Sequence, residues 1–258
     1  MRHIRHYAIS DGRYLERLFA LVQPSWRVLE IGCSSGCISL EMARRGAHVE
    51  GIDVSAEAIS VAQAYAAEHP PCGNLHYRVA DINCDPLPEA HYDLIVALGV
   101  LPHLVDVRAA LERIRTALKP RGLLYVSDFL ETPTANALIV GAFTMLLPAE
   151  ISYRDKIRHL LRLRTRAVER MKASMETRGF SPFEGSGRHQ NSLETVRELF
   201  DVEWLRIHNA FVRPVTANLA MPERLAVLIG RLLLPFDELA VRLRLLQGLS
   251  YKLIARRP

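Results

Sequence analysis

Residues 28–37 read Val28-Leu29-Glu30-Ile31-Gly32-Cys33-Ser34-Ser35-Gly36-Cys37, and residues 49–53 read Val49-Glu50-Gly51-Ile52-Asp53. The apolar run at the start predicts a buried parallel strand, and the glycines and serines after it predict a tight turn that opens a helix. Glycine at such a turn lets the backbone approach a ligand closely. About twenty residues later a second strand should end in Asp53, where a carboxylate can accept both hydroxyls of a ribose. Together the two segments predict an α/β domain that binds a nucleoside.

An acidic residue on the first predicted strand narrows the kind of nucleoside. A dinucleotide site places a pyrophosphate at the helix N-terminus and uses G-x-G-x-x-G without a negative charge nearby. Here the chain has Glu30, Gly32 and Gly36, with Ser34 at the place of a middle glycine. Glu30 would repel a diphosphate but could order the loop around a cationic ligand. These residues therefore argue against a nicotinamide dehydrogenase.

The same passage resembles the first motif of the class I S-adenosylmethionine-dependent methyltransferases. The resemblance implies that Glu30, Gly32, Ser34 and Gly36 surround the methionine part of the cofactor and that Asp53 takes the ribose. The cofactor implied is S-adenosyl-L-methionine, with S-adenosyl-L-homocysteine as the product.

Three later segments resemble further motifs of that family, in the family's order. Val79-Ala80-Asp81-Ile82 resembles the end of the third strand, where Asp81 would hold the adenine and Ile82 would cover it. Residues 92–104 resemble the fourth strand and the loop beneath the sulfonium, and residues 118–127 resemble the fifth strand, entered through a Lys-Pro-x-Gly turn. The resemblance is dense over residues 25–130. It implies a cofactor site made of Glu30, Gly32, Cys33, Ser34, Gly36, Asp53, Val54, Asp81, Ile82, Ala97 and Leu98.

The order of strand and helix patterns predicts one methyltransferase domain over residues 1–258. We expect a Rossmann-like, seven-stranded, mostly parallel sheet with helices on both faces. The expected parts are an N-terminal helical segment (1–24), the cofactor-binding core (25–133), a helical lid (134–191), and the last helix and strands (192–258), with a helical insertion at 222–247. Ser55 and Asp106 are predicted to cap the helices that follow them, and the last two strands are expected at 202–211 and 250–256.

Composition places the chain among intracellular proteins. The hydrophobic share of 49% over 258 residues suffices for a large core. Four cysteines lie in the first third, without zinc-site spacing and without a signal peptide before them: Cys33, Cys37, Cys72 and Cys84. We therefore expect reduced thiols, a cytoplasmic protein and no metal site.

Positive charge is concentrated in the second half of the chain. Residues 1–133 hold 13 Lys or Arg and 16 Asp or Glu, and the remainder holds 20 and 12. Residues 154–178 contain nine basic and three acidic residues at helical spacing. This stretch is open to three interpretations: a solvated helix face, a lid over an anionic acceptor, or a contact with a membrane or nucleic acid. We favour the lid, and the lack of interleaved aromatic residues argues against nucleic acid.

The leucine-rich stretch 222–247 also carries arginines at helical spacing. Packing on the domain or on a second subunit, as in a homodimer, is one interpretation. Peripheral contact with a lipid headgroup surface is the other. We favour packing on the domain or on a second subunit.

His103 is the best-placed candidate for a catalytic base, because it follows the fourth predicted strand in a loop that should open toward the transferred methyl group. Its alternative role is to line or cap that loop. His189 is a weaker candidate, and His3 and His6 could close over the pocket from the N-terminus.

The turn after the fourth predicted strand limits the classes of molecule that can be the methyl acceptor. Enzymes that methylate adenine amines or glutamine amides resemble one another in an Asn/Asp-Pro-Pro-aromatic turn there, whereas this chain has Ala97-Leu98-Gly99-Val100. We expect a biosynthetic methyltransferase that acts on a small molecule at oxygen, with a metabolite, quinone, lipid or sugar as acceptor. The alternatives are a nucleic-acid or protein methyltransferase that uses residues 154–178, and a non-catalytic or atypical S-adenosylmethionine-binding protein.

Overall fold

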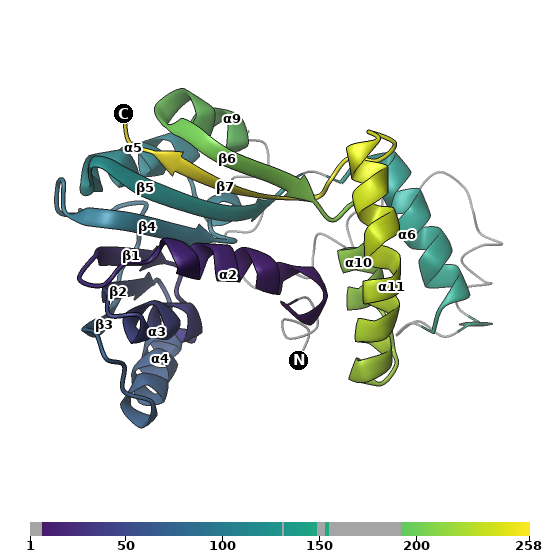
Figure 1. Ribbon diagram of the computed structural model, residues 1–258, viewed down its shortest axis with the longest axis horizontal. Helices are drawn as coiled ribbons and strands as arrows, with labels where there is room; N and C mark the ends of the chain where they lie inside the picture. Colours follow the sequence, from purple (N-terminus) through teal and green to yellow (C-terminus); the bar gives the residue numbers. More distant parts are fainter. Residues whose placement is uncertain (1–6, 131, 149–152, 155–191) are drawn as a thin grey trace. The chain divides into compact units, whose positions relative to one another are not determined.

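The computed structural model describes residues 7–130, 132–148, 153–154 and 192–258 (Figure 1). Its contacts divide the chain into two compact units, each assembled from separate segments. The sheet unit comprises Glu16–Phe129, Ser181–Arg206 and Lys252–Pro258, and the helical unit comprises Met1–Leu15, Leu130–Phe180 and Ile207–Tyr251. The single domain and the internal boundaries expected from the sequence stay predictions.

Seven strands form one sheet in the order β3-β2-β1-β4-β5-β7-β6. Their bounds are β1 (Arg27–Ile31), β2 (His48–Asp53), β3 (Leu75–Val79), β4 (Tyr92–Leu98), β5 (Leu118–Phe129), β6 (Asp201–His208) and β7 (Ser250–Arg256). Strands β1 to β5 pair in parallel. The insertion of β7 between β5 and β6 departs from the order 3-2-1-4-5-6 of the dinucleotide-binding fold. The predicted seven-stranded, mostly parallel sheet is confirmed.

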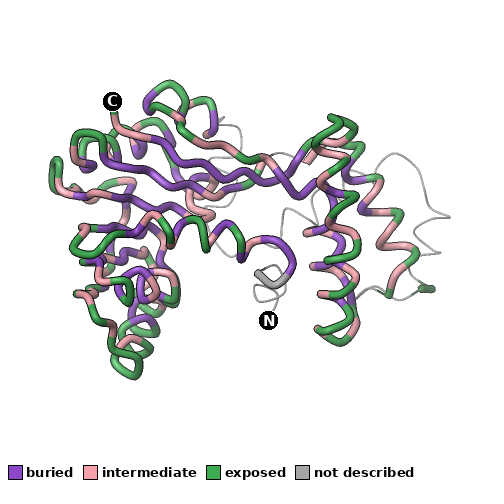
Figure 2. The backbone as a smooth tube through the Cα atoms, in the orientation of Figure 1, coloured by how far each residue is buried: buried purple, intermediate pink, exposed green. Residues whose placement is uncertain are grey.

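The central strands are buried along their length, as Figure 2 shows. Leu29, Leu94, Ile95, Val96 and Tyr125 have no exposed surface. A parallel strand covered on both faces needs such continuous apolar residues, which explains the unbroken runs in the sequence. Burial of each side chain of this size contributes roughly 1.5 to 3 kcal/mol.

Two helices of the sheet unit, α4 (Ala56–Glu68) and α5 (Val107–Ala117), begin at the caps that the sequence predicts. The others are α3 (Cys37–Arg44) and α9 (Ser192–Leu199), with α2 (Gly12–Leu21) before β1 and the 3-10 turn η2 (Leu101–His103) after β4. Helices α3 and α4 pack on β2 and β3, and α5 packs on β5 and α9. The Ala58 N–H donates to Ser55 Oγ at 3.1 Å, and the Ala109 N–H donates to Asp106 Oδ1 at 3.0 Å. Both predicted N-caps are confirmed.

The helical unit contains η1 (Tyr7–Asp11), α6 (Thr134–Leu146), α10 (Val212–Ala217) and α11 (Glu223–Arg242). Its core joins Ile9, Val140, Phe211 and Val215, and the rings of Phe143 and Phe211 stack with centroids 5.5 Å apart. No helix among the described residues has both the length and the apolar composition to cross a membrane.

The sixth strand ends three residues earlier than predicted, at His208. Asn209 has a φ of 60°, and the backbone N–H groups of Ala210, Phe211 and Val212 then donate to the Asp237 carboxylate at 2.7 to 3.0 Å. The chain therefore turns into α10 instead of continuing the ladder. Residues 155–178 of the basic stretch, the loop 179–191, and His3, His6 and His189 lie outside the described residues.

Candidate functional site

The loop between β1 and α3 follows a path that only glycine accommodates well. Gly32, Ser34 and Gly36 have φ values of 71°, 49° and 76°, in the left-handed region. The Gly32 N–H donates to the carbonyl oxygen of Ile52 at 2.8 Å, which fastens the loop to the end of β2. A Cβ atom at Gly32 would lie 2.7 Å from Val100 Cγ2 in the loop after β4. The conformation therefore brings the ends of β1, β2 and β4 together around position 32.

Asp53, at the end of β2, holds this loop with its side chain. Asp53 Oδ2 accepts the Ser34 N–H and Oδ1 accepts the Ser55 N–H, each at 2.9 Å. The Ala80 N–H, after β3, donates to the Asp53 carbonyl at 3.0 Å. A carboxylate offers about four lone-pair positions, so both oxygens can accept a further hydrogen bond. The side chain is half-buried, so a ligand hydroxyl has access to it.

Glu30 lies beneath the loop rather than on its surface. It is 2% exposed, and its carboxyl group accepts a hydrogen bond from Ser39 Oγ in α3. Burial raises the pKa of Glu30 to about 8, an effect that the Ser39 hydrogen bonds only partly offset. At neutral pH the group is therefore largely protonated. The repulsion of a diphosphate expected from the sequence does not follow from this environment, whereas an ordering of the loop from below does.

Cys33 and Val54 flank the two carboxyl groups with apolar surface. Cys33 is 5% exposed, and burial, with negative charge on Glu30 and Asp53, raises the pKa of its thiol to about 12. The thiol is therefore neutral at physiological pH. Val54 is 59% exposed beside Asp53. It leaves apolar surface next to the position predicted for the ribose.

The loop after β3 is held by its own polar groups. Asp81 Oδ1 accepts the Asn83 N–H at 2.8 Å and Asn83 Nδ2 at 2.7 Å, and the Asp81 N–H donates to Asp85 Oδ2 at 2.8 Å. Ile82 is only 4% exposed, so it offers little surface for covering a base. Asn83 Oδ1 accepts the Val105 N–H at 3.0 Å, which ties this loop to the one after β4. The adenine contacts implied for Asp81 and Ile82 stay predictions.

Strand β4 leads into the turn that carries His103. Ala97 is fully buried and Leu98 is half-buried, and the Gly99 N–H then donates to the Ser127 carbonyl at 2.7 Å. The buried Asp128, at the end of β5, accepts the Leu101 N–H on Oδ2 at 3.0 Å. The start of η2 is therefore anchored to β5.

His103 is half-buried at the end of η2, and its backbone N–H donates to Val100 at 2.9 Å. Its Nδ1 atom is buried and has no hydrogen-bond partner among the residues that the structure describes. A base needs a ring nitrogen that is not already committed to a protein donor. His103 meets this requirement, and its catalytic role stays a prediction.

Sequence reasoning missed two supporting residues, Ser39 and Asp128. Ser39 lies within α3 and gives no local signal, because its partner is on a neighbouring strand. Asp128 directly follows the apolar strand run and Ser127, and a carboxylate at the carboxyl end of a parallel strand is a signal that could have been used.

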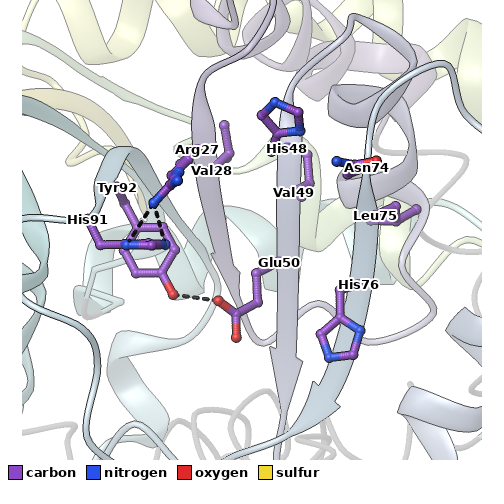
Figure 3. Close-up of a pocket in the computed structure, with 10 residues that line it drawn as sticks. All are labelled: Arg27, Val28, His48, Val49, Glu50, Asn74, Leu75, His76, His91 and Tyr92. Carbon is purple, nitrogen blue, oxygen red and sulfur yellow. Dashed lines mark hydrogen bonds between the residues drawn. The ribbon is translucent and has the colours of Figure 1, made fainter.

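A separate pocket lies at the opposite end of the strands, where β1 to β4 begin (Figure 3). Glu50 accepts hydrogen bonds from Tyr92 Oη and Arg78 Nε there. Burial alone would raise the pKa of Glu50, but these hydrogen bonds and the Arg78 charge lower it. None of the predicted cofactor residues lines this pocket. Because ligands of open parallel sheets bind at the carboxyl ends of the strands, we place the candidate site at the other end. The lining residues are Arg27, Val28, His48, Val49, Glu50, Asn74, Leu75, His76, His91 and Tyr92.

A family model described as a methyltransferase domain matches residues 1–180. The chain belongs to this methyltransferase family. Similar curated proteins include the ubiquinone biosynthesis O-methyltransferases of Aeromonas salmonicida, 35% identical over 45% of this chain and 49% of that protein, and of Xylella fastidiosa, 38% identical over 51% and 55%. The chain spans about half the length of the curated relatives it matches.

Solved structures of two methyltransferases and of a cyclase share the fold. An S-adenosylmethionine-dependent methyltransferase from Mesorhizobium loti gives a TM-score of 0.57 at 17% identity, covering 96% of this chain and 97% of that chain. The geranyl diphosphate C-methyltransferase of Streptomyces coelicolor gives 0.60 at 13% identity, covering 96% and 76%. The [4+2]-cyclase SpnF gives 0.56 at 19% identity, covering 94% and 80%.

Proposed function

We propose that this methyltransferase-family protein transfers a methyl group from S-adenosyl-L-methionine to a small-molecule acceptor at oxygen. One observation carries the proposal: the glycine loop after β1 and the Asp53 carboxylate are joined by the hydrogen bond from Ser34, at the carboxyl end of the sheet. The residues fit the cofactor, because Gly32 permits close approach of the backbone and Asp53 keeps unused lone pairs. When bound, the cofactor supplies an already activated methyl group.

The protein's own residues would bind and orient the reactants. Asp53 accepts the ribose hydroxyls, and Glu30 with Ser39 supports the loop from below. Alignment of the acceptor with exclusion of water can account for most of the rate enhancement in such a reaction. His103 takes the proton from a hydroxyl acceptor as its oxygen becomes the nucleophile.

Methylation at oxygen is favoured by the curated relatives, whose names state O-methyltransferase activity in ubiquinone biosynthesis. The finer predictions on partners and location also stay proposals: a homodimer, peripheral membrane contact and a cytoplasmic protein. Methylation of nucleic acid or protein rested on the basic stretch 154–178, nearly all of which lies outside the described residues.

Methyl-labelled S-adenosylmethionine, incubated with the protein and with fractions of a lipid extract and an aqueous metabolite extract, tests the proposal. We expect label to enter one fraction in an alkali-stable ether linkage, and transfer to fail with Asp53→Ala. Calorimetry should show binding of S-adenosylhomocysteine and weaker binding of NAD. Tight S-adenosylhomocysteine binding without label transfer to any fraction would favour a non-catalytic or atypical protein. Tighter binding of NAD would refute the cofactor assignment.

A further inference from the structure

Helix α11 is apolar on two opposite faces. On the buried face, Ala226 and Gly230 are buried, and Val227, Leu233 and Val241 pack on the core of the helical unit. Gly230 packs so closely that a Cβ atom there would meet the Ile9 side chain. The opposite face is open to solvent, as the exposed turns of α11 in Figure 2 show. Its exposed row consists of Leu225, Leu228, Leu232, Phe236, Leu239 and Leu243.

The spacing of this row makes it one continuous stripe. Its members follow one another at steps of three or four residues, which places them on a single side of the helix. From residue 225 to residue 243 the stripe is about 27 Å long at 1.5 Å per residue. Each member is at least 50% exposed, and Phe236 is 66% exposed. Single exposed apolar residues are ordinary, whereas a contiguous row of this length marks a binding surface.

Arginines border the stripe on one side. Arg224, Arg231 and Arg242 are exposed and are separated by seven and eleven residues, about two and three helical turns, so they share an edge of α11. Arg244 is exposed just beyond the helix. Of the three acidic residues of α11, all of whose residues are described, Glu223 is half-buried in the first turn and Asp237 is buried. Glu238 lies four residues before Arg242, on the arginine edge, and pairs with Arg13. The exposed face is therefore apolar and basic.

We propose that this face of α11 binds the surface of a membrane that contains anionic lipids. The helix would lie in the plane of the interface, with Leu228, Leu232 and Phe236 among the acyl chains and the arginines at the lipid phosphates. Basic side chains near such a surface are attracted to the anionic lipids, and long side chains at this depth reach the headgroups. A second copy of the chain is a poorer match, because Glu238, the acidic residue of α11 on the arginine edge, is already paired with Arg13 of its own chain.

This inference is independent of the proposed methyl transfer. Helix α11 lies beyond residues 1–180, which the family model matches, and it contributes none of the predicted cofactor residues. A failure of the membrane proposal would therefore leave S-adenosylhomocysteine binding unchanged. A failure of the cofactor proposal would likewise leave vesicle binding unchanged.

Cosedimentation with vesicles tests the proposal. The full chain is spun with vesicles of phosphatidylcholine alone or with 30% phosphatidylglycerol, at physiological salt. We expect most of the protein to pellet with the anionic vesicles and at least tenfold weaker partition onto the neutral ones. Leu232→Ser with Phe236→Ser should lower the anionic partition at least tenfold, and Arg224→Gln with Arg242→Gln should lower it several-fold.

Matched controls remove exposed apolar side chains, or exposed arginine charges, from the sheet unit instead of α11. Val61→Ser with Val105→Ser removes two exposed apolar side chains, and Arg115→Gln with Arg206→Gln removes two exposed charges. Both controls should pellet like the wild type, and calorimetry with S-adenosylhomocysteine should verify that all variants are folded. Absence of pelleting, or equal losses in α11 variants and controls, would overturn the proposal. A dimer seen by light scattering that Leu232→Ser with Phe236→Ser dissociates, without vesicle binding, would assign the face to a second copy instead.

Discussion

Two aspartates, one in each unit, bind backbone N–H groups in similar ways but differ in what remains available. Asp53 in the sheet unit accepts two N–H groups and is half-buried. Asp237 in the helical unit accepts three, at the start of α10, and has no exposed surface. The first keeps lone pairs that a ligand can reach, and the second serves only the chain itself. Exposure, more than the hydrogen-bond pattern, separates a binding carboxylate from a structural one.

The largest effect should come from Asp237→Ala. Three buried N–H groups would lose their acceptor, and with about 1 to 3 kcal/mol for each unsatisfied group we expect a loss of roughly 4 kcal/mol in the free energy of unfolding. Urea unfolding measures this loss. Glu238→Ala, which removes only an exposed ion pair, should cost less than about 1 kcal/mol. Similar losses in both variants would show that Asp237 does not hold α10.

Glu30→Gln tests the buried Glu30 carboxyl group through the pH dependence of the free energy of unfolding. Its pKa in the folded protein is about 8, above the ordinary value of 4.5, so its protonated form stabilises the fold at low pH and that stability is lost as pH rises toward and through 8. The variant has no such loss. We expect it to gain roughly 3 kcal/mol over the wild type between pH 5 and pH 9. Thermal unfolding across this range, with Glu41→Gln at a half-buried position as control, measures the difference. A pH-independent difference would contradict the buried environment of Glu30.

His103→Ala should leave the fold and cofactor binding nearly intact and lower turnover about a hundredfold, which corresponds to about 2.7 kcal/mol. His91→Ala, in the pocket at the other end of the strands, is the matched control. Turnover within a few fold of the wild type would leave His103 as a residue that lines its loop.

Asp53→Ala should weaken S-adenosylhomocysteine binding by roughly 2 kcal/mol, because it removes a charge-assisted contact to the ribose. In this variant the Ser34 and Ser55 N–H groups can donate hydrogen bonds to water instead. The loss in unfolding free energy should therefore be smaller than for Asp237→Ala. Calorimetry and urea unfolding on the same variant separate the two quantities. Unchanged affinity in a folded variant would place the ribose elsewhere and remove the contrast between the two aspartates.

Local patterns sufficed to predict the strands and caps of the sheet unit. Buried parallel strands require continuous apolar runs, and Ser55 and Asp106 satisfy N–H groups only three residues away, so both features can be read from neighbouring residues. The end of β6 could not be predicted, because its cause is Asp237, 29 positions after His208. The burial of Glu30 could not be predicted for the same reason, since it depends on α3 and the neighbouring strands.

The motif order predicts the residues of the candidate site, and that assignment stays a prediction, whereas their surroundings could not be predicted. The motif order singles out Gly32, Asp53 and His103, whereas the burial of Ile82 and the support from Asp128 depend on packing between loops. The leucines of α11 show the same limit. Because both faces of the helix are apolar, their spacing predicts a helix but does not tell which face is buried.

The contact between Gly230 and Ile9 has a consequence for the order of folding. These residues are 221 positions apart, and Arg13 and Glu238, in the same unit, form an ion pair over a comparable separation. During synthesis, strands β1 to β5 leave the ribosome long before the partners of Ile9 and Arg13 exist. Contacts of such long range form late, because the closure entropy must be overcome first. The segment that contains Ile9 and Arg13 should therefore dock last, after the sheet has formed. In a nascent chain stalled before residue 230, this segment should be accessible to proteases.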